Sequence, residues 1–317
     1  MSGSISGTTI DVNGLTKRFG EHTAVDDLTF TVEPGRVTGF LGPNGAGKTT
    51  TLRMLLGLVA PTSGHASFGG RPYRELRDPL RVVGTALEAS SFLPGRTGRN
   101  HLRVLAASAG IPDSRVDAAL EATGMGEAGR RRVGGYSLGM RQRLGLSTAL
   151  LGDPEVLVLD EPINGLDPEG IRWIRGFLRG LADEGRTVLI SSHLLSEVQQ
   201  TVDEVVIISK GRIVHTGGLE ALETRTSVLV DAPDRAGLAA AFAAANLQGA
   251  VLADGFSVVG TEPAEIGAIA QRAGVSLSLL KPVNEGIEDV FFQLTEGEYA
   301  VDQAPVNHST TTTEVGA

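Results

Sequence analysis

Cysteine is absent from the 317 residues, which excludes disulfide bonds and thiol chemistry. The chain also lacks any run of about 18 apolar residues, so no segment is expected to span a membrane. Residues 1–6 lack the basic and apolar regions of a signal peptide, and none is expected. Basic residues do not predominate either. The net charge is −9, which argues against nonspecific binding to nucleic acid.

A glycine-rich motif lies between a predicted strand and a predicted helix. Residues 37–41 form a short apolar run typical of a buried strand, and residues 50–58 carry leucines at helical spacing. Glycines between them let the backbone wrap closely around phosphate oxygens, where a Cβ would block the approach. A glycine-rich surface turn is the alternative, but the order strand, loop, helix favours phosphate binding. The motif matches G-x-x-x-x-G-K-[ST] in full and consists of Gly42, Pro43, Asn44, Gly45, Ala46, Gly47, Lys48 and Thr49.

Two carboxylates follow a second apolar run. Residues 156–159 are wholly aliphatic, as is typical of a strand buried on both faces of a parallel sheet. Asp160 and Glu161 come directly after it, at the strand end where such sheets bind ligands. A solvated strand end is the alternative. Beside a phosphate-binding loop, however, we expect Asp160 to hold Mg²⁺ and Glu161 to act as general base toward an attacking water.

A third motif lies between these two and carries a family resemblance. Residues 136–143 read Tyr-Ser-Leu-Gly-Met-Arg-Gln-Arg, in which Ser137 is expected to cap a helix that begins near Met140. The order of the three motifs, followed by His193 after an apolar run, resembles the nucleotide-binding subunit of ABC transporters. Three positions depart from the usual Leu-Ser-Gly-Gly-Gln signature. The sequence of this motif instead resembles that of the bacitracin- and daunorubicin-type branch of antibiotic exporters. The departures are Tyr136, Leu138 and Met140.

The resemblance covers roughly residues 8–222 and implies an α/β fold, that of a P-loop NTPase of the ABC type. This nucleotide-binding domain is expected over residues 1–222, with a mixed core sheet and a helical subdomain at about residues 85–150. Residues 223–297 show a β-α-β-β-α-β rhythm that predicts a small α/β accessory domain, with its last strand at 275–280 and a closing helix that contains Phe291. Residues 298–317 are expected to be a disordered tail.

The resemblance also implies roles that the pattern alone leaves open. Phe19 matches the aromatic residue that stacks on adenine, although an isolated phenylalanine is also typical of a core. Ser137 and Gly139 of one subunit are expected to close over the γ-phosphate held by another, so a second nucleotide-binding subunit, identical or different, is needed. Asp167 matches the loop that connects the two active sites. The resemblance implies catalytic roles for Glu161, His193 and Lys48. The residues expected to contact the nucleotide are Phe19, residues 42–49, Thr50, Ser137, Gly139 and Asp167. Those expected to ligate Mg²⁺ are Thr49, Asp160 and Glu88.

Glu88 stands where the family normally has a glutamine, and the antibiotic-export branch often has glutamate there. A carboxylate is still a suitable ligand for a hard cation. The departure therefore does not predict an inactive enzyme.

The expected function is ATP hydrolysis that energises export of a drug, antibiotic, peptide or lipid-like substrate through a separate transmembrane permease. The chain would lie at the cytoplasmic side of the membrane, bind ATP and Mg²⁺, and have no nucleic-acid partner. A soluble ABC-type ATPase with a cytosolic macromolecular client is the alternative. Two features stay open: Phe92 either anchors the membrane subunit or packs in the core, and the arginines 130–132 form either a solvated turn or a contact with a partner or phosphate.

Overall fold

The computed structural model describes residues 7–87, 92–221, 226–245, 247, 249–252, 255–259, 261–284 and 287–296. Glu88 and the predicted tail 298–317 lie outside these ranges. Within them, the structure contains no helix of the length and apolar character that crossing a bilayer requires.

A six-stranded sheet forms the centre of the molecule, and its first five strands in spatial order run parallel. Successive side chains of one strand enter two different cores: Leu157 and Leu159 lie in one, Val156 and Val158 in the other. The aliphatic runs show no alternation because both faces of the sheet are buried. In spatial order the strands are β5 (Val83–Ala86), β6 (Val156–Leu159), β7 (Thr187–Ser192), β3 (Val37–Leu41), β8 (Glu204–Ser209) and the antiparallel β9 (Arg212–Gly218).

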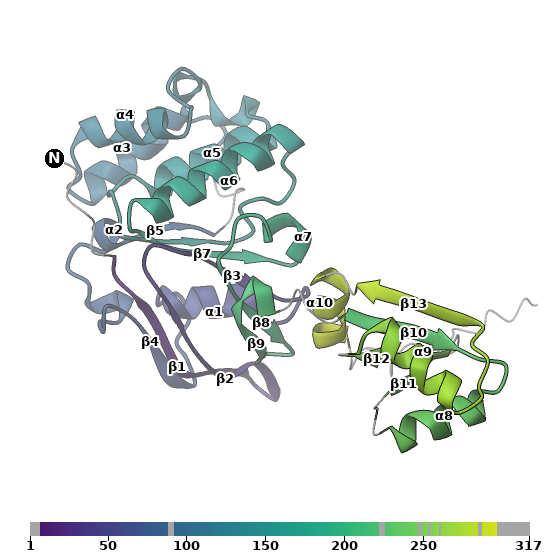
Figure 1. Ribbon diagram of the computed structural model, residues 1–317. Helices are drawn as coiled ribbons and strands as arrows, with labels where there is room; N and C mark the ends of the chain where they lie inside the picture. The colour runs from purple at the N-terminus through teal and green to yellow at the C-terminus, as the bar shows by residue number, and fades with distance from the viewer. Residues whose placement is uncertain are drawn as a thin grey trace, which may run out of the picture.

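A second sheet and one helix cover one face of the central sheet (Figure 1). The antiparallel order is β2 (His22–Val32), β1 (Ile10–Phe19) and β4 (Ser63–Phe68). Helix α1 (Lys48–Leu55) lies between the two sheets and contributes Leu52 and Leu55 to their shared core. The short helix α2 (Pro79–Val82) leads into β5.

Helices cover the other face, and three of them, α3, α4 and α5, fall within the range expected for the helical subdomain (Figure 1). The longest, α6, is amphipathic and buries Ile174 and Leu178 against the sheet. In α5, Leu144 and Leu146 are buried, as the helical spacing predicts. The helices on this face are α3 (Gly98–Ser108), α4 (Asp113–Ala122), α5 (Leu138–Ala149), α6 (Pro168–Asp183) and α7 (Leu195–Val198).

The C-terminal part builds a separate four-stranded antiparallel sheet with its own core. The β-α-β-β-α-β rhythm is confirmed, and its spatial order β11-β12-β10-β13 is that of a ferredoxin-like unit. The predicted last strand was placed too early, because it begins at Leu279 and not at Val275. The elements are β10 (Thr226–Asp231), α8 (Arg235–Ala244), β11 (Gly249–Leu252), β12 (Gly255–Val259), α9 (Pro263–Arg272) and β13 (Leu279–Asn284).

Helix α10 (Ile287–Glu296) follows this sheet in sequence but packs on the first part of the chain. It contacts α7, β8 and β9, and its Val290 and Phe291 are buried in the core beneath the helical face. The Ser209 hydroxyl donates to the carbonyl of Thr295 at 3.3 Å. In the sequence, the ferredoxin-like unit thus lies between two segments, β9 and α10, that both belong to the larger body, and in space it lies to one side of that body (Figure 1).

Candidate active site

The phosphate-binding motif forms the loop between β3 and α1. Gly45 and Gly47 have φ angles of +84° and +104°, in the region that favours glycine. A Cβ on Gly47 would lie 2.5 Å from the Ala24 carbonyl oxygen, and one on Gly42 would lie 2.3 Å from the Ile208 carbonyl oxygen. The loop therefore requires glycine at both positions, for packing as well as for conformation.

Lys48, the first residue of α1, is 6% exposed and turns back over the loop. Its Nζ donates to the carbonyls of Gly42 at 2.7 Å and Pro43 at 3.2 Å, and lies 3.7 Å from Oε1 of Glu161. Burial lowers the pKa of Lys48, and the carboxylates of Glu161 and Asp160 oppose this shift. The ammonium group is thus held by carbonyl oxygens and a carboxylate at the mouth of the loop.

Asp160 is fixed by two hydroxyl groups. Thr49 Oγ1 donates to Oδ2 of Asp160 at 3.0 Å, and the Ser191 hydroxyl donates to Oδ1. Ser191 Oγ also accepts the backbone N–H of Glu161 at 2.9 Å, so one serine positions both carboxylate residues. Ser191 is not among the residues predicted from the sequence. The signal was present, because β6 and β7 are parallel neighbours and their ends place Asp160 beside Ser191.

Glu161 lies at a sharp turn, with a φ of +49° that costs a residue other than glycine about 1 kcal/mol. This conformation directs its carboxylate back toward the loop. Oε2 is 2.8 Å from Nδ1 of His193, while Oε1 faces Lys48. Of the three predicted catalytic residues, Glu161 therefore contacts both Lys48 and His193.

These residues line one cavity of about 570 Å³. Phe19 stands at its edge, 51% exposed, with Nζ of Lys17 4.9 Å from the ring centroid. An exposed phenylalanine beside a phosphate loop presents a free ring face, which a core phenylalanine does not. Of the predicted residues, Phe19, Asn44, Gly45, Gly47, Lys48, Thr49, Thr50, Glu161 and His193 line the cavity, and His22, Ala24 and Asn164, to which the sequence analysis gave no role, line it too. His22 is brought there by the β1–β2 hairpin, where it pairs with Phe19.

The side chains at the position expected to bind the metal offer oxygen ligands. Thr49 and Asp160 offer a hydroxyl and a carboxylate, the ligand types that Mg²⁺ prefers. Within the part of the chain that the structure describes, no three histidine, aspartate or glutamate side chains gather as a ligand set. These side chains fit a cation that binds one carboxylate and completes its coordination shell with water and phosphate oxygens.

Ser137, Gly139 and Asp167 lie together in a second hollow of about 260 Å³. Ser137 caps α5, which begins at Leu138, and accepts the N–H of Met140 at 3.3 Å. Asp167 caps α6 and accepts the N–H of Gly170 at 2.8 Å. Among the described residues, the two hollows share no lining residue, so one chain presents two separate sites.

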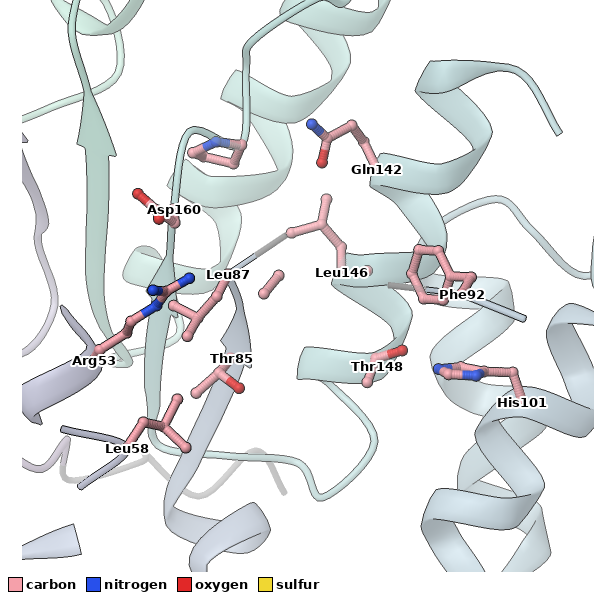
Figure 2. Close-up of a pocket in the computed structure, with 13 residues that line it drawn as sticks. Arg53, Leu58, Thr85, Leu87, Phe92, His101, Gln142, Leu146, Thr148 and Asp160 are labelled. Carbon is pink, nitrogen blue, oxygen red and sulfur yellow. The ribbon is translucent and has the colours of Figure 1, made fainter. Parts of the chain in front are cut away.

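A groove of about 390 Å³ lies between the sheet region and the helical subdomain (Figure 2). Arg53, Leu58 and Leu87 line one wall, and Phe92 and His101 stand on the opposite one. Asp160 also lines the groove, which therefore adjoins the active site. Ten of its lining residues are labelled in Figure 2: Arg53, Leu58, Thr85, Leu87, Phe92, His101, Gln142, Leu146, Thr148 and Asp160.

Comparison with known proteins shows the family. The sequence profile described as "ABC transporter" matches residues 25–164. The bacitracin transport ATP-binding protein BcrA of Bacillus licheniformis is 44% identical over 221 residues, which cover 69% of this chain and 72% of BcrA. The chain belongs to the ABC transporter family. As a member of that family it binds ATP and is an ATPase.

Two further comparisons extend this result. The Nod factor export ATP-binding protein I of Burkholderia lata is 36% identical over 301 residues, covering 91% of this chain and 97% of the relative. The match to that relative therefore extends over most of the C-terminal part as well. A solved structure described as the ATP binding subunit of an ABC transporter superposes with a TM-score of 0.62 at 26% identity, over 68% of this chain and 92% of that one. The predicted α/β fold of the ABC type is confirmed.

Proposed function

We propose that this ABC transporter ATPase energises the export of a drug, antibiotic, peptide or lipid-like substrate through a separate membrane subunit. The names of two relatives support this, since one is a bacitracin transport protein and the other a Nod factor export protein. The observation that supports ATP hydrolysis is that Glu161 contacts both Lys48 and His193 in one cavity. The chain would act at the cytoplasmic face of the membrane.

In this proposal the reaction is an in-line attack of water on the γ-phosphoryl group, and positioning and charge stabilisation supply most of the catalysis. Glu161 orients the water and accepts its proton, and His193 and Ser191 keep the glutamate in place through its carboxylate and its backbone N–H. Lys48 and the loop amides stabilise the phosphate oxygens. Phe19 stacks on the adenine. Bound Mg²⁺, held through Thr49 and Asp160, would neutralise charge on the β- and γ-phosphates.

A dimer completes the site in this proposal. The hollow of Ser137, Gly139 and Asp167 is separate from the phosphate cavity, so a second subunit must bring the two together. Ser137 sits at the start of α5, where backbone N–H groups favour an anion. The second subunit is either a copy of this chain or a homologue, and mass spectrometry of the trapped ATP-bound dimer distinguishes the two.

We assign the groove of Figure 2 to the membrane subunit. It opens beside the active site, since Asp160 lines it, and apolar side chains form much of its walls. A segment seated in it would touch both the sheet region and the helical subdomain. Movement of one relative to the other would then be transmitted to the permease.

The test uses Glu161→Gln and the matched exposed control Glu265→Gln. We expect Glu161→Gln to lower ATP turnover by a hundredfold or more, as about 10²-fold is the smaller effect of removing a general base. The variant should then trap an ATP-bound dimer. Turnover is measured by phosphate release, and partners by mass spectrometry of tagged chain purified with ATP from detergent-solubilised membranes.

A multi-spanning membrane protein recovered in stoichiometric amount with Glu161→Gln would support the transporter assignment. Recovery with ribosomes, or with nothing, would replace it by a soluble ATPase. If Glu161→Gln turned over ATP as fast as Glu265→Gln, Glu161 would not be the general base.

A further inference from the structure

The helical subdomain has a charge opposite to that of the whole chain. Residues 92–152 contain nine arginines and four acidic residues, a net charge of +5 in a chain of net charge −9. Three of these arginines are neutralised locally in ion pairs: Arg99 with Asp117, Arg103 with Asp113, and Arg115 with Asp153. The remaining excess of positive charge lies elsewhere in the subdomain.

Part of that excess is concentrated where two loops run side by side. The Gly98 N–H donates to the Arg131 carbonyl at 3.3 Å, and the Val133 N–H donates to the Arg96 carbonyl at 2.9 Å. These bonds bring Arg96 next to Arg131 and Arg132, both of which are exposed. Within the residues that the structure describes, none of the three arginines has an ion-pair partner. We call Arg96, Arg131 and Arg132 the basic rim.

The basic rim adjoins the groove assigned to the membrane subunit through Arg96, whose charge acts on His101 in the groove wall. The Phe92 ring packs edge-on against the His101 ring, with centroids 5.0 Å apart, and both line the groove (Figure 2). Burial and the charge of Arg96 lower the pKa of His101, so this wall of the groove stays uncharged. Leu93 and Val104 beside it are 57% and 50% exposed. The surface therefore joins an apolar hollow to a cluster of cations.

We propose that the groove and the basic rim together select an acidic segment of the membrane subunit. An apolar side chain of that segment would enter the hollow beside Phe92, and its carboxylates would face Arg96, Arg131 and Arg132. Complementary charge of this kind steers association and rejects other partners. The hollow favours a protein segment over a flat lipid surface, because only a projecting side chain fills it. This inference rests on the proposed function and adds the chemistry of the partner.

The experiment measures binding of fluorescein-labelled peptides to the full chain by anisotropy. Three peptides share one sequence with a single phenylalanine anchor, and differ only in carrying three glutamates, three glutamines or three lysines. The glutamate peptide should bind at least tenfold more tightly than the other two. Its affinity should fall steeply from about 0.05 M to about 0.5 M salt, because the Debye length shortens over this range.

Two double variants with the same charge change locate the effect. Arg131→Glu with Arg132→Glu should abolish the preference for the glutamate peptide, and Arg71→Glu with Arg77→Glu, at exposed positions outside the subdomain, should leave it intact. Arg131→Lys with Arg132→Lys should retain it, since charge and not shape carries the selection. All variants should keep the parent ATPase rate, because neither arginine lines the phosphate cavity.

The outcomes separate this inference from the function on which it rests. Equal or undetectable binding of the three peptides would overturn the inference and leave the ATPase assignment standing. Sedimentation with phosphatidylglycerol vesicles that depends on the same arginines, without discrimination among the peptides, would make the rim a lipid site and also overturn it. A parent chain that does not hydrolyse ATP would instead overturn the proposed function.

Discussion

Replacement of Phe291 by alanine should destabilise the ATPase body, although this residue lies 98 positions after His193, the last of the predicted catalytic residues in sequence. The Phe291 side chain is 3% exposed and lies in the core beneath the helical subdomain. Truncation of a buried phenylalanine to alanine costs about 3 to 5 kcal/mol. With an m-value of about 3 kcal/mol per M, the urea midpoint should fall by about 1 to 1.7 M.

The single tryptophan reports the correct transition. Trp173 lies in α6, packs against the same core as Phe291, and stacks on Phe177 with centroids 5.1 Å apart. Its fluorescence therefore follows unfolding of the ATPase body and not of the ferredoxin-like unit. Urea titrations of the full chain, followed by Trp173 emission, measure the predicted shift.

The neighbouring phenylalanine is the control. Phe292 on the same helix is 44% exposed, so its truncation should cost about 1 kcal/mol, roughly half the value of full burial. Equal shifts for Phe291→Ala and Phe292→Ala would refute the assignment of α10 to the ATPase body. So would a Phe291→Ala chain whose Trp173 transition is unchanged.

Three further predictions concern the active site and the fold. Ser191→Ala removes the hydroxyl that accepts the Glu161 N–H and donates to Asp160. It should therefore lower kcat about tenfold to a hundredfold with little change in KM. An unchanged kcat would show that the serine does not position the two carboxylates. Gly47→Ala places a Cβ 2.5 Å from a carbonyl oxygen and should abolish binding of a fluorescent ATP analogue, so retained binding would contradict the packing argument. His215 has a buried Nε2 that finds no hydrogen-bond partner among the described residues, and burial lowers its pKa below the unfolded value of about 6.5. Because unfolding then takes up a proton, stability should fall as the pH drops from about 7.5 to about 5.5, and the melting temperature of His215→Gln should change less over this range than that of the parent.

The phosphate loop and the buried strands were predictable because their signals are local. The apolar run 37–41 is β3, with all five residues buried, and the run 156–159 is β6, with both faces covered. The glycine requirement at Gly47 follows from φ and from close packing, and the motif alone indicates it. Sequence pattern therefore sufficed where neighbouring residues determine the structure.

The last strand of the ferredoxin-like unit was placed wrongly for a physical reason. Val275, Leu277 and Leu279 alternate as in a strand. However, the Val275 N–H donates to the Ala270 carbonyl at the end of α9 at 2.9 Å, so it does not join the sheet. Val275 and Leu277 still pack on the core of the unit from a loop. Apolar periodicity shows that a side chain is buried, but not whether its backbone is paired.

Contacts between distant segments account for the rest of what the sequence did not predict. Ser191 reaches Asp160 only because β6 and β7 are neighbours, and α10 contacts α7 although β8, β9 and the whole ferredoxin-like unit lie between them in the sequence. Periodicity indicates that α10 has an apolar face, but gives no sign of which core receives it. The roles assigned to Ser137, Gly139 and Asp167 remain predictions, because they depend on a second subunit.

The position of α10 has a consequence for biosynthesis. A nascent chain that has grown only as far as β9 already carries the phosphate loop, Asp160, Glu161 and His193, yet it lacks Val290 and Phe291. The core beneath the helical subdomain then has an open apolar side until the ferredoxin-like unit and α10 have left the ribosome. A premature stop codon shortly before α10 should therefore yield a polypeptide with a complete set of ATPase motifs that chaperones and proteases treat as unfinished.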